Sequence, residues 1–174
     1  MKKTIYYSFL FAFSLCLLCC GCKKNMPDGM PRLYRVALTL TQESKPLAEA
    51  NVNLVAVDQP EISRFGIGGR TDELGNVSLT TRGQYEGVPE GKYKVLVTKN
   101  EVIGLQAPPE LMFKELEQWN AEHKSELAKT KYVSRVDSVY ANVKSTPLEI
   151  TVVKGKNAFT LDCGKAVETE LKAR

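Results

Sequence analysis

Short stretches of alternating apolar and polar residues, separated by turn residues, recur along most of this chain. Three of them are residues 34–41 (YRVALTLT), 50–57 (ANVNLVAV) and 92–97 (KYKVLV). A period of two places one set of side chains on the buried face of a strand and the other set in solvent. Short strands of this kind, with a turn about every 8 to 12 residues, are typical of an all-β sandwich.

Four further segments complete the predicted sheets. They are residues 66–71 (GIGGRT), 77–81 (VSLTT), 148–153 (LEITVV) and 157–163 (NAFTLDC). A turn is expected at residues 72–75 (DELG), because Asp can bond its own backbone and Gly accepts a positive φ. We expect residues 58–63 and 84–91 to be loops or turns and residues 130–146 to be irregular. The sequence therefore predicts an all-β, seven-stranded Greek-key β-sandwich.

One helix interrupts this pattern. Residues 109–129 lack glycine, have no proline after Pro109 and are rich in Glu, Lys, Leu and Ala. An apolar stripe at helical spacing is predicted there. Its members are Met112, Leu116, Trp119, His123 and Leu127. We expect one helix of about five turns, forming an insertion over residues 108–130 before the last two strands.

Three of the turn motifs resemble those of a known family. They are residues 45–50 (KPLAEA), 71–75 (TDELG) and 89–95 (PEGKYKV). In this pattern the chain resembles the transthyretin-like, carboxypeptidase-regulatory-like domains found in exported bacterial lipoproteins, notably of the planctomycete and verrucomicrobial groups. The resemblance covers residues 34–162, apart from the variable region 101–144. It implies the transthyretin-like sandwich and no catalytic residues, and the helix departs from it, since relatives more often have a Pro-rich loop there.

Four of the five cysteines lie near the N-terminus, at positions 16, 19, 20 and 22. A positive start and an apolar run over residues 5–18 indicate a signal peptide of residues 1–21, too short to span a membrane comfortably. The small residue Gly21 before Cys22 resembles the lipobox of bacterial lipoproteins, in which the cysteine becomes the lipidated N-terminus. Cys20 is the alternative lipidation site, and an ordinary secreted protein is the alternative class.

This reading divides the chain into four parts. They are the signal peptide 1–21, a lipidated Cys22 with a flexible tether to residue 33, the sandwich domain 34–164, and a charged tail 165–174 that is frayed or helical. Loss of Lys2 and Lys3 with the signal lowers the formal charge from +4 to about +2. Acidic and basic residues are interspersed, so no nucleic-acid-binding stripe is expected. Cys163 remains as one ordinary thiol, so we expect no internal disulfide.

Catalytic chemistry has few candidates. His123 and Glu126 have the H-x-x-E spacing of some zinc ligands, but catalytic zinc needs three protein ligands and His123 is the only histidine. No G-x-S-x-G motif accompanies it. We therefore expect no enzyme, no metal and no cofactor, and we expect His123 to pack under the sandwich at the edge of the apolar stripe.

Two features are candidates for binding. The helix carries Trp119 and His123, which we expect to contact an envelope protein if the helix is an interface. Three tyrosines in predicted loops are candidates for a glycan site: Tyr85, Tyr132 and Tyr140. The leading hypothesis is a non-enzymatic, lipid-anchored structural or interaction module of the bacterial envelope. The alternative is a carbohydrate- or small-ligand-binding lipoprotein that serves transport or degradation. Lys23 after Cys22, where Asp would signal inner-membrane retention in some bacteria, favours the outer membrane.

Replacing the thiol at position 22 tests the anchor. Because the Cys22 thiol is the expected acceptor of the diacylglyceryl group, Cys22→Ser should leave an unprocessed protein that appears in the soluble fraction. The measurement is membrane fractionation with the intact mass of the product. A Cys22→Ser protein that still partitions to membranes as a cleaved species would contradict this lipidation site.

Overall fold

A computed structural model describes residues 26–171. The chain divides into two compact units, residues 1–30 and residues 31–174. In the described part of the first unit, the Met30 amide donates to the Pro27 carbonyl at 3.2 Å and closes a turn. Over residues 26–171, no helix is both long enough and apolar enough to cross a membrane. Cys22 and the predicted signal peptide lie outside the described residues.

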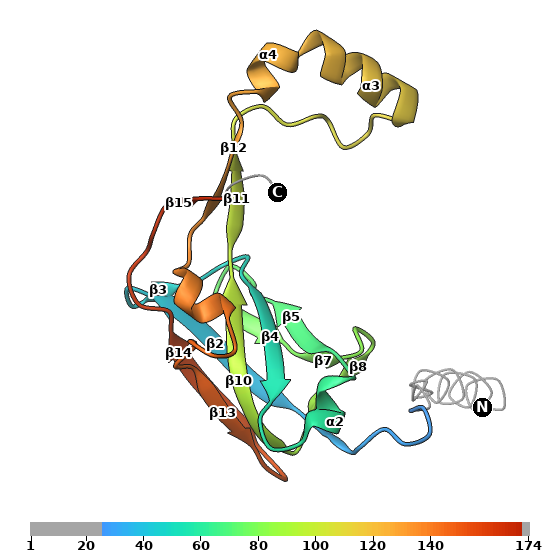
Figure 1. Cartoon of the computed structure of the whole chain (residues 1–174). Coiled ribbons are helices and arrows are strands. Elements are labelled where there is room, and N and C mark those ends of the chain that lie inside the picture. Colours follow the sequence, from blue (N-terminus) through green and yellow to red (C-terminus); the bar gives the residue numbers. More distant parts are fainter. Residues whose placement is uncertain (1–25, 172–174) are drawn as a thin grey trace, which may run out of the picture. The chain divides into compact units, whose positions relative to one another are not determined.

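The second unit is built mainly from strands, which confirms the all-β prediction (Figure 1). Its largest sheet has six strands in the order β13 (Glu149–Val152), β10 (Gly91–Thr98), β4 (Asn51–Ala56), β5 (Ile67–Arg70), β7 (Thr80–Thr81) and β8 (Tyr85–Glu86). A second sheet contains β14 (Asn157–Asp162), β2 (Val36–Gln42) and β3 (Lys45–Pro46), with β6 (Asn76–Ser78) also paired to β2.

Two smaller sheets complete the described strands. One contains β11 (Asn100–Ile103), β12 (Lys131–Ser134) and β15 (Thr169–Glu170). The other pairs β1 (Leu33–Tyr34) with β9 (Val88–Pro89). The remaining elements are α2 (Pro60–Ser63), α3 (Phe113–Glu122), α4 (Lys124–Leu127) and the 3-10 helix η2 (Ser138–Ala141). The residues therefore form four sheets, whereas a simple sandwich has two.

The alternation read from the sequence predicts the core correctly. In β2, Leu38 and Leu40 are buried, and in β10 Tyr93, Val95 and Val97 are buried. These residues belong to one apolar cluster with the buried side chains of β4 and β13. The cluster therefore lies between the six-stranded and the four-stranded sheets, as in a sandwich.

Two connections carry the chain from one sheet to the other. The segment predicted as one strand over residues 77–81 pairs Val77 with Leu38 of β2, and then pairs Thr81 with Ile67 of β5. Buried Leu79 lies at this crossing. The turn around Gly155 likewise leads from β13 in the large sheet to β14, which lies parallel to β2. The single strand predicted over residues 77–81 and the pair predicted over residues 148–153 and 157–163 are thus each divided between the two sheets.

The turn at residues 72–75 forms as predicted. The Asp72 carboxylate accepts the Leu74 amide at 2.9 Å and the Asn76 amide at 2.8 Å. Gly75 has φ +77°, a conformation that favours glycine. The turn thereby leads the chain from β5 to β6, with Thr71 bridged to Val77 across it.

Several local predictions are wrong. The loop predicted over 58–63 contains the one-turn helix α2, with proline in its first turn, where a missing N–H costs nothing. The turn region 84–91 contains β8 and β9, and the irregular region 130–146 contains β12 and η2. The tail forms β15, whose Thr169 pairs with Ser134, so its described part is neither frayed nor helical there. Four strands follow the helices, not two.

The buried apolar cluster should dominate stability. Leu40 is 0 % exposed and Leu74 is 68 % exposed. Leu40→Ala should lower the free energy of unfolding by about 2–5 kcal/mol, because it leaves a cavity between the sheets. Leu74→Ala, the matched control, should change it by less than about 0.5 kcal/mol. The measurement is urea unfolding of both variants, and equal losses would contradict the assigned core.

Candidate interaction site

The helices are carried on a two-stranded ribbon. β11 pairs antiparallel with β12 from Asn100 opposite Ser134 to Ile103 opposite Lys131. β11 begins two residues after β10 ends, so the ribbon continues a strand of the large sheet. Figure 1 shows the ribbon leading away from the sheets, with α3 and α4 beyond its end. We call residues 105–130 the helical head.

Close packing closes the base of this head. Gly104 has φ +128°, and a Cβ there would lie 2.8 Å from the Thr130 Oγ1. The Thr130 hydroxyl donates to the Leu105 carbonyl at 3.1 Å. The two ends of the head therefore meet at a point where only glycine fits.

The head contains two helices, whereas one was predicted. α3 begins at Phe113, four residues later than expected, with the Glu115 carboxylate accepting the Met112 amide at 3.1 Å. α3 ends at Glu122, and the amide of its C-cap residue His123 donates to the Trp119 carbonyl at 3.0 Å. The His123 Nδ1 also lies 2.9 Å from this carbonyl, and its ring stacks on Trp119 with centroids 4.4 Å apart. His123 thus separates α3 from α4.

The predicted apolar stripe is only half-buried. Leu116, Trp119, His123 and Leu127 are partly covered, and neither α3 nor α4 contains a buried residue. The prediction that His123 packs under the sandwich is wrong, because the head is held on the ribbon. Of the stripe residues, Leu127 lines an open pocket of about 420 Å³. Its lining includes Val102, Leu105, Asn120, Leu127, Thr130 and Tyr132.

Two large apolar side chains at the start of α3 face solvent. Met112 is 74 % exposed and Phe113 is 76 % exposed, and they are adjacent in the chain. Tyr132 of the ribbon is also exposed. Exposed apolar groups of this size, close together, are typical of interaction surfaces. The predicted stripe begins at Met112 and does not include Phe113, although Phe113 lies three residues before Leu116 and so also has helical spacing.

An ionic network joins the base of the ribbon to the C-terminal segment. The Arg135 guanidinium donates to the Glu101 carboxylate at 2.6 Å and also binds Glu168. Lys99 lies 3.4 Å from the same Glu101 carboxylate. The hydrogen bond from Arg135 lowers the pKa of Glu101 below its ordinary value of 4.5, and the Lys99 ammonium adds to this shift. The network ties β11, β12 and the segment before β15 together.

The candidate catalytic groups do not converge. His123 is stacked on Trp119, and no group of three His, Cys, Asp or Glu side chains within residues 26–171 is placed to hold a metal ion. Cys163 is buried, and burial raises the pKa of its thiol to about 12. The protonated thiol is a poor nucleophile at neutral pH.

The three tyrosines considered for glycan binding are separated. Tyr85 lies in β8, Tyr132 lies in β12 and Tyr140 lies in η2, where it packs against the main core. The stacked ring pair in the described residues is Trp119 with His123. Trp119 and His123 are therefore in direct contact, whereas the three tyrosines lie on separate elements and do not form one aromatic platform.

Comparisons with known proteins identified no relative of this chain. A scan against family models, a search of curated proteins and a search of solved structures each gave no match to this chain.

Acidification should loosen the ribbon before the core. A carboxyl with a lowered folded-state pKa stabilises the fold above its ordinary pKa, and this contribution is lost as the pH falls through the lowered value. Below about pH 4.5, amide hydrogen exchange in β11, β12 and β15 should therefore rise more than in β4.

Arg135→Gln should mimic this effect at neutral pH. The increase in exchange should be less than about tenfold, because partly exposed ion pairs are weak. Arg70→Gln is the matched control, since Arg70 is in an exposed 3.8 Å pair with Glu49 on the large sheet. Equal exchange rates in the ribbon of both variants would refute a stabilising role for Arg135.

Proposed function

We propose that this chain is a non-enzymatic, lipid-anchored protein of the bacterial envelope that binds another envelope protein through its helical head. In this proposal a transthyretin-like Greek-key sandwich is the scaffold, Cys22 carries the lipid, and the outer membrane is the favoured location. The anchor rests on the lipobox-like sequence before Cys22. The scaffold rests on the turn motifs and on the shared core of the two large sheets.

The exposure of the head carries the proposal. The sheets enclose a complete apolar cluster without any residue of α3 or α4. The fold therefore does not need the helices for its core, and yet it holds them at the end of a ribbon. Met112 and Phe113 remain in solvent there, where a partner can bury them.

The chemistry of the head favours a protein partner with a particular surface. Residues 108–130 contain five glutamates and three lysines, a formal charge of −2. An apolar patch within a net acidic surface fits an apolar groove bordered by basic residues. Trp119 and His123 stack on each other at the C-terminal end of α3 and are partly covered. Met112 and Phe113 at its start are exposed, so we place the centre of the binding surface at these two residues.

Crosslinking in native membranes tests the proposal. The full chain is compared with a Met112→Ala, Phe113→Ala variant, and co-purified proteins are identified by mass spectrometry. One envelope protein should be recovered with the wild type and lost, by about tenfold or more, with the variant, because exposed anchors of this kind dominate interface energies. The thermal stability of the variant should not change, since both side chains are exposed.

A variant that loses two exposed apolar side chains outside the helical head is the control. Val57→Ala, Leu74→Ala removes two exposed apolar side chains from loops of the sheets. It should recover the partner as well as the wild type does. Loss with both variants would indicate non-specific adhesion, and unchanged recovery with both variants would refute the head as the interface.

A further inference from the structure

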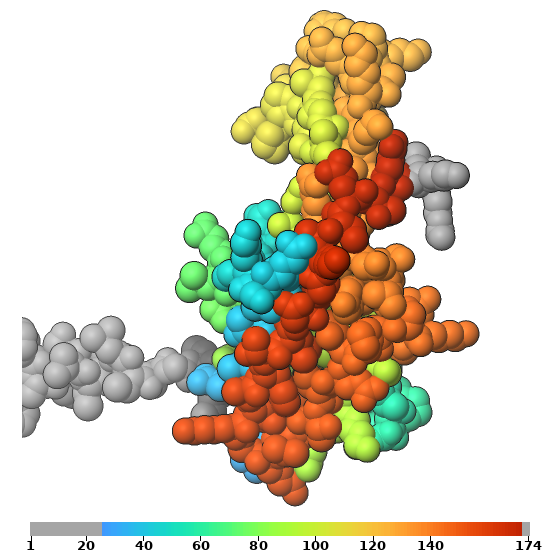
Figure 2. Space-filling view, turned by 90° about the vertical axis from the view of Figure 1, so that its left-hand side faces the viewer, coloured from blue at the N-terminus to red at the C-terminus, as the bar shows by residue number. Residues whose placement is uncertain are grey.

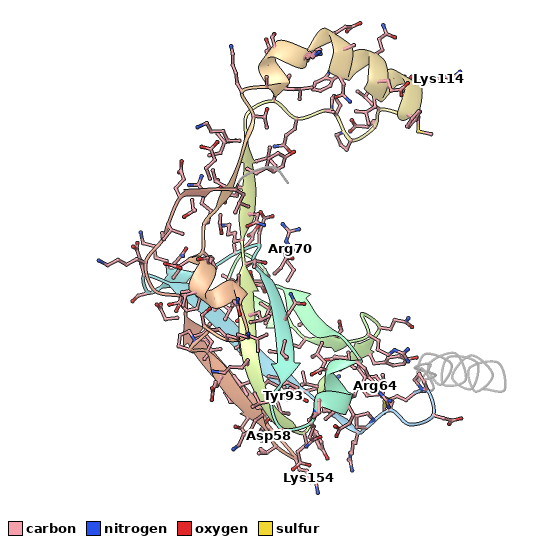
Figure 3. The ribbon with its side chains drawn as sticks, viewed as in Figure 1. Asp58, Arg64, Arg70, Tyr93, Lys114 and Lys154 are labelled. Carbon is pink, nitrogen blue, oxygen red and sulfur yellow. The ribbon has the colours of Figure 1, made fainter. Side chains whose placement is uncertain are left out.

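A second surface lies on the sheets, at the end where the tether joins the domain. It is a hollow of about 510 Å³ between the start of β2 and the start of β14. Its lining includes Arg32, Tyr34, Arg35, Ala37, Lys156 and Ala158. Figure 3 labels Lys154, which is two residues from Lys156, at the end of the domain opposite Lys114 of the helical head.

Small side chains create this hollow. Ala37 of β2 lies directly beside Ala158 of β14, and both are exposed on the outer face of the four-stranded sheet. On the inner face the neighbouring pair, Leu38 with Phe159, belongs to the core or packs against it. Figure 2 shows β14, in red, along the surface of the domain. The outer face is therefore low and apolar at the alanines, with longer side chains around it.

The rim of the hollow is cationic. Arg32, Arg35 and Lys156 are all exposed. The Arg32 guanidinium lies 5.7 Å from the centre of the Tyr34 ring, a cation–π contact that directs it along this surface. Arg35 is paired with Glu86 at 3.2 Å, but this pair is 85 % and 59 % exposed and therefore weak. Lys156 has no ion pair among the described residues.

We propose that this hollow binds the phosphate headgroups of anionic phospholipids, so that the domain rests on the membrane with this end. Part of this proposal rests on the proposed function, since the lipid anchor supplies the membrane. Nine residues lie between Cys22 and Arg32, so the ten steps between them reach about 33–36 Å at most. An anchor at Cys22 therefore keeps these cations within reach of the bilayer surface.

A lipid surface fits this site better than a free anion does. A dedicated phosphate site holds buried donors that converge on the ligand. In the described residues every buried side-chain N or O atom already has a partner, and the three cations are exposed on flexible side chains. Exposed cations on flexible side chains match the phosphates of a fluid headgroup layer, which offers negative charge without a fixed geometry.

Lysine acetylation of the full chain in lipid nanodiscs tests this assignment. Discs of phosphatidylcholine alone are compared with discs of phosphatidylcholine and phosphatidylglycerol in equal amounts, and labelling is read by peptide mass spectrometry. Lys156 should react about fivefold more slowly in the anionic discs, as expected for one basic residue at an anionic surface. Lys114 in the head is the internal control and should react equally in both. Neutral discs with added inorganic phosphate form a third arm.

Variants make the test specific. Arg32→Gln, Arg35→Gln should abolish the protection of Lys156, with no change in melting temperature because both side chains are exposed. Glu86→Gln should increase the protection, because it frees Arg35. Equal labelling of Lys156 in both disc types, or protection of Lys114 equal to that of Lys156, would overturn the proposal.

The third arm and the anchor test separate the remaining outcomes. Protection by inorganic phosphate in neutral discs, without further protection by phosphatidylglycerol, would identify a free-anion site and overturn the lipid assignment. Failure of the lipid anchor appears separately, as unchanged fractionation of Cys22→Ser. Failure of the head as an interface appears only in the crosslinking experiment.

Discussion

The packing of two sheets on one buried apolar cluster is the interaction on which residues 31–171 depend. Leu38 and Leu40 of β2 contribute from one sheet, and Val95 and Val97 of β10 contribute from the other. β10 pairs with β4 on one side and β13 on the other. Because β11 follows β10 so closely, the ribbon starts from one of the best-secured strands of the domain. The helical head is thus attached to the core through a strand and not through a flexible loop.

Alternation and turn chemistry predict the elements that this core fixes. The buried positions of β2, β4 and β10 follow from a period of two, and the turn at Asp72 follows from one Asp and one Gly. Local pattern does not say which sheet a strand joins. Residues 77–81 alternate without a break, and yet they divide between two sheets at Leu79, because pairing partners distant in the chain decide that crossing.

The ribbon and the head show the limit of the same reasoning. The strand β12 (KYVS) is too short and too polar to be recognised alone, and it exists because β11 and β15 pair with it on its two sides. Leu116 and Trp119 of α3 and Leu127 of α4, all members of the predicted apolar stripe, are partly covered in the structure. An apolar stripe cannot distinguish a helix face that packs on the main core from one that is only partly covered. The structure is therefore needed to show that the stripe residues are only partly covered and that Phe113 is exposed.

The two surfaces proposed for binding differ in the physical forces available to them. The head offers Met112 and Phe113, whose burial releases water and requires a partner of matching shape. The hollow offers Arg35 and Lys156 above alanines, and attraction between charges needs little shape but weakens with salt. A surface of the second kind suits a fluid lipid layer, and one of the first kind suits a folded protein. Because the ribbon and the hollow lie at opposite ends of the same core, one domain has room to bind both at once.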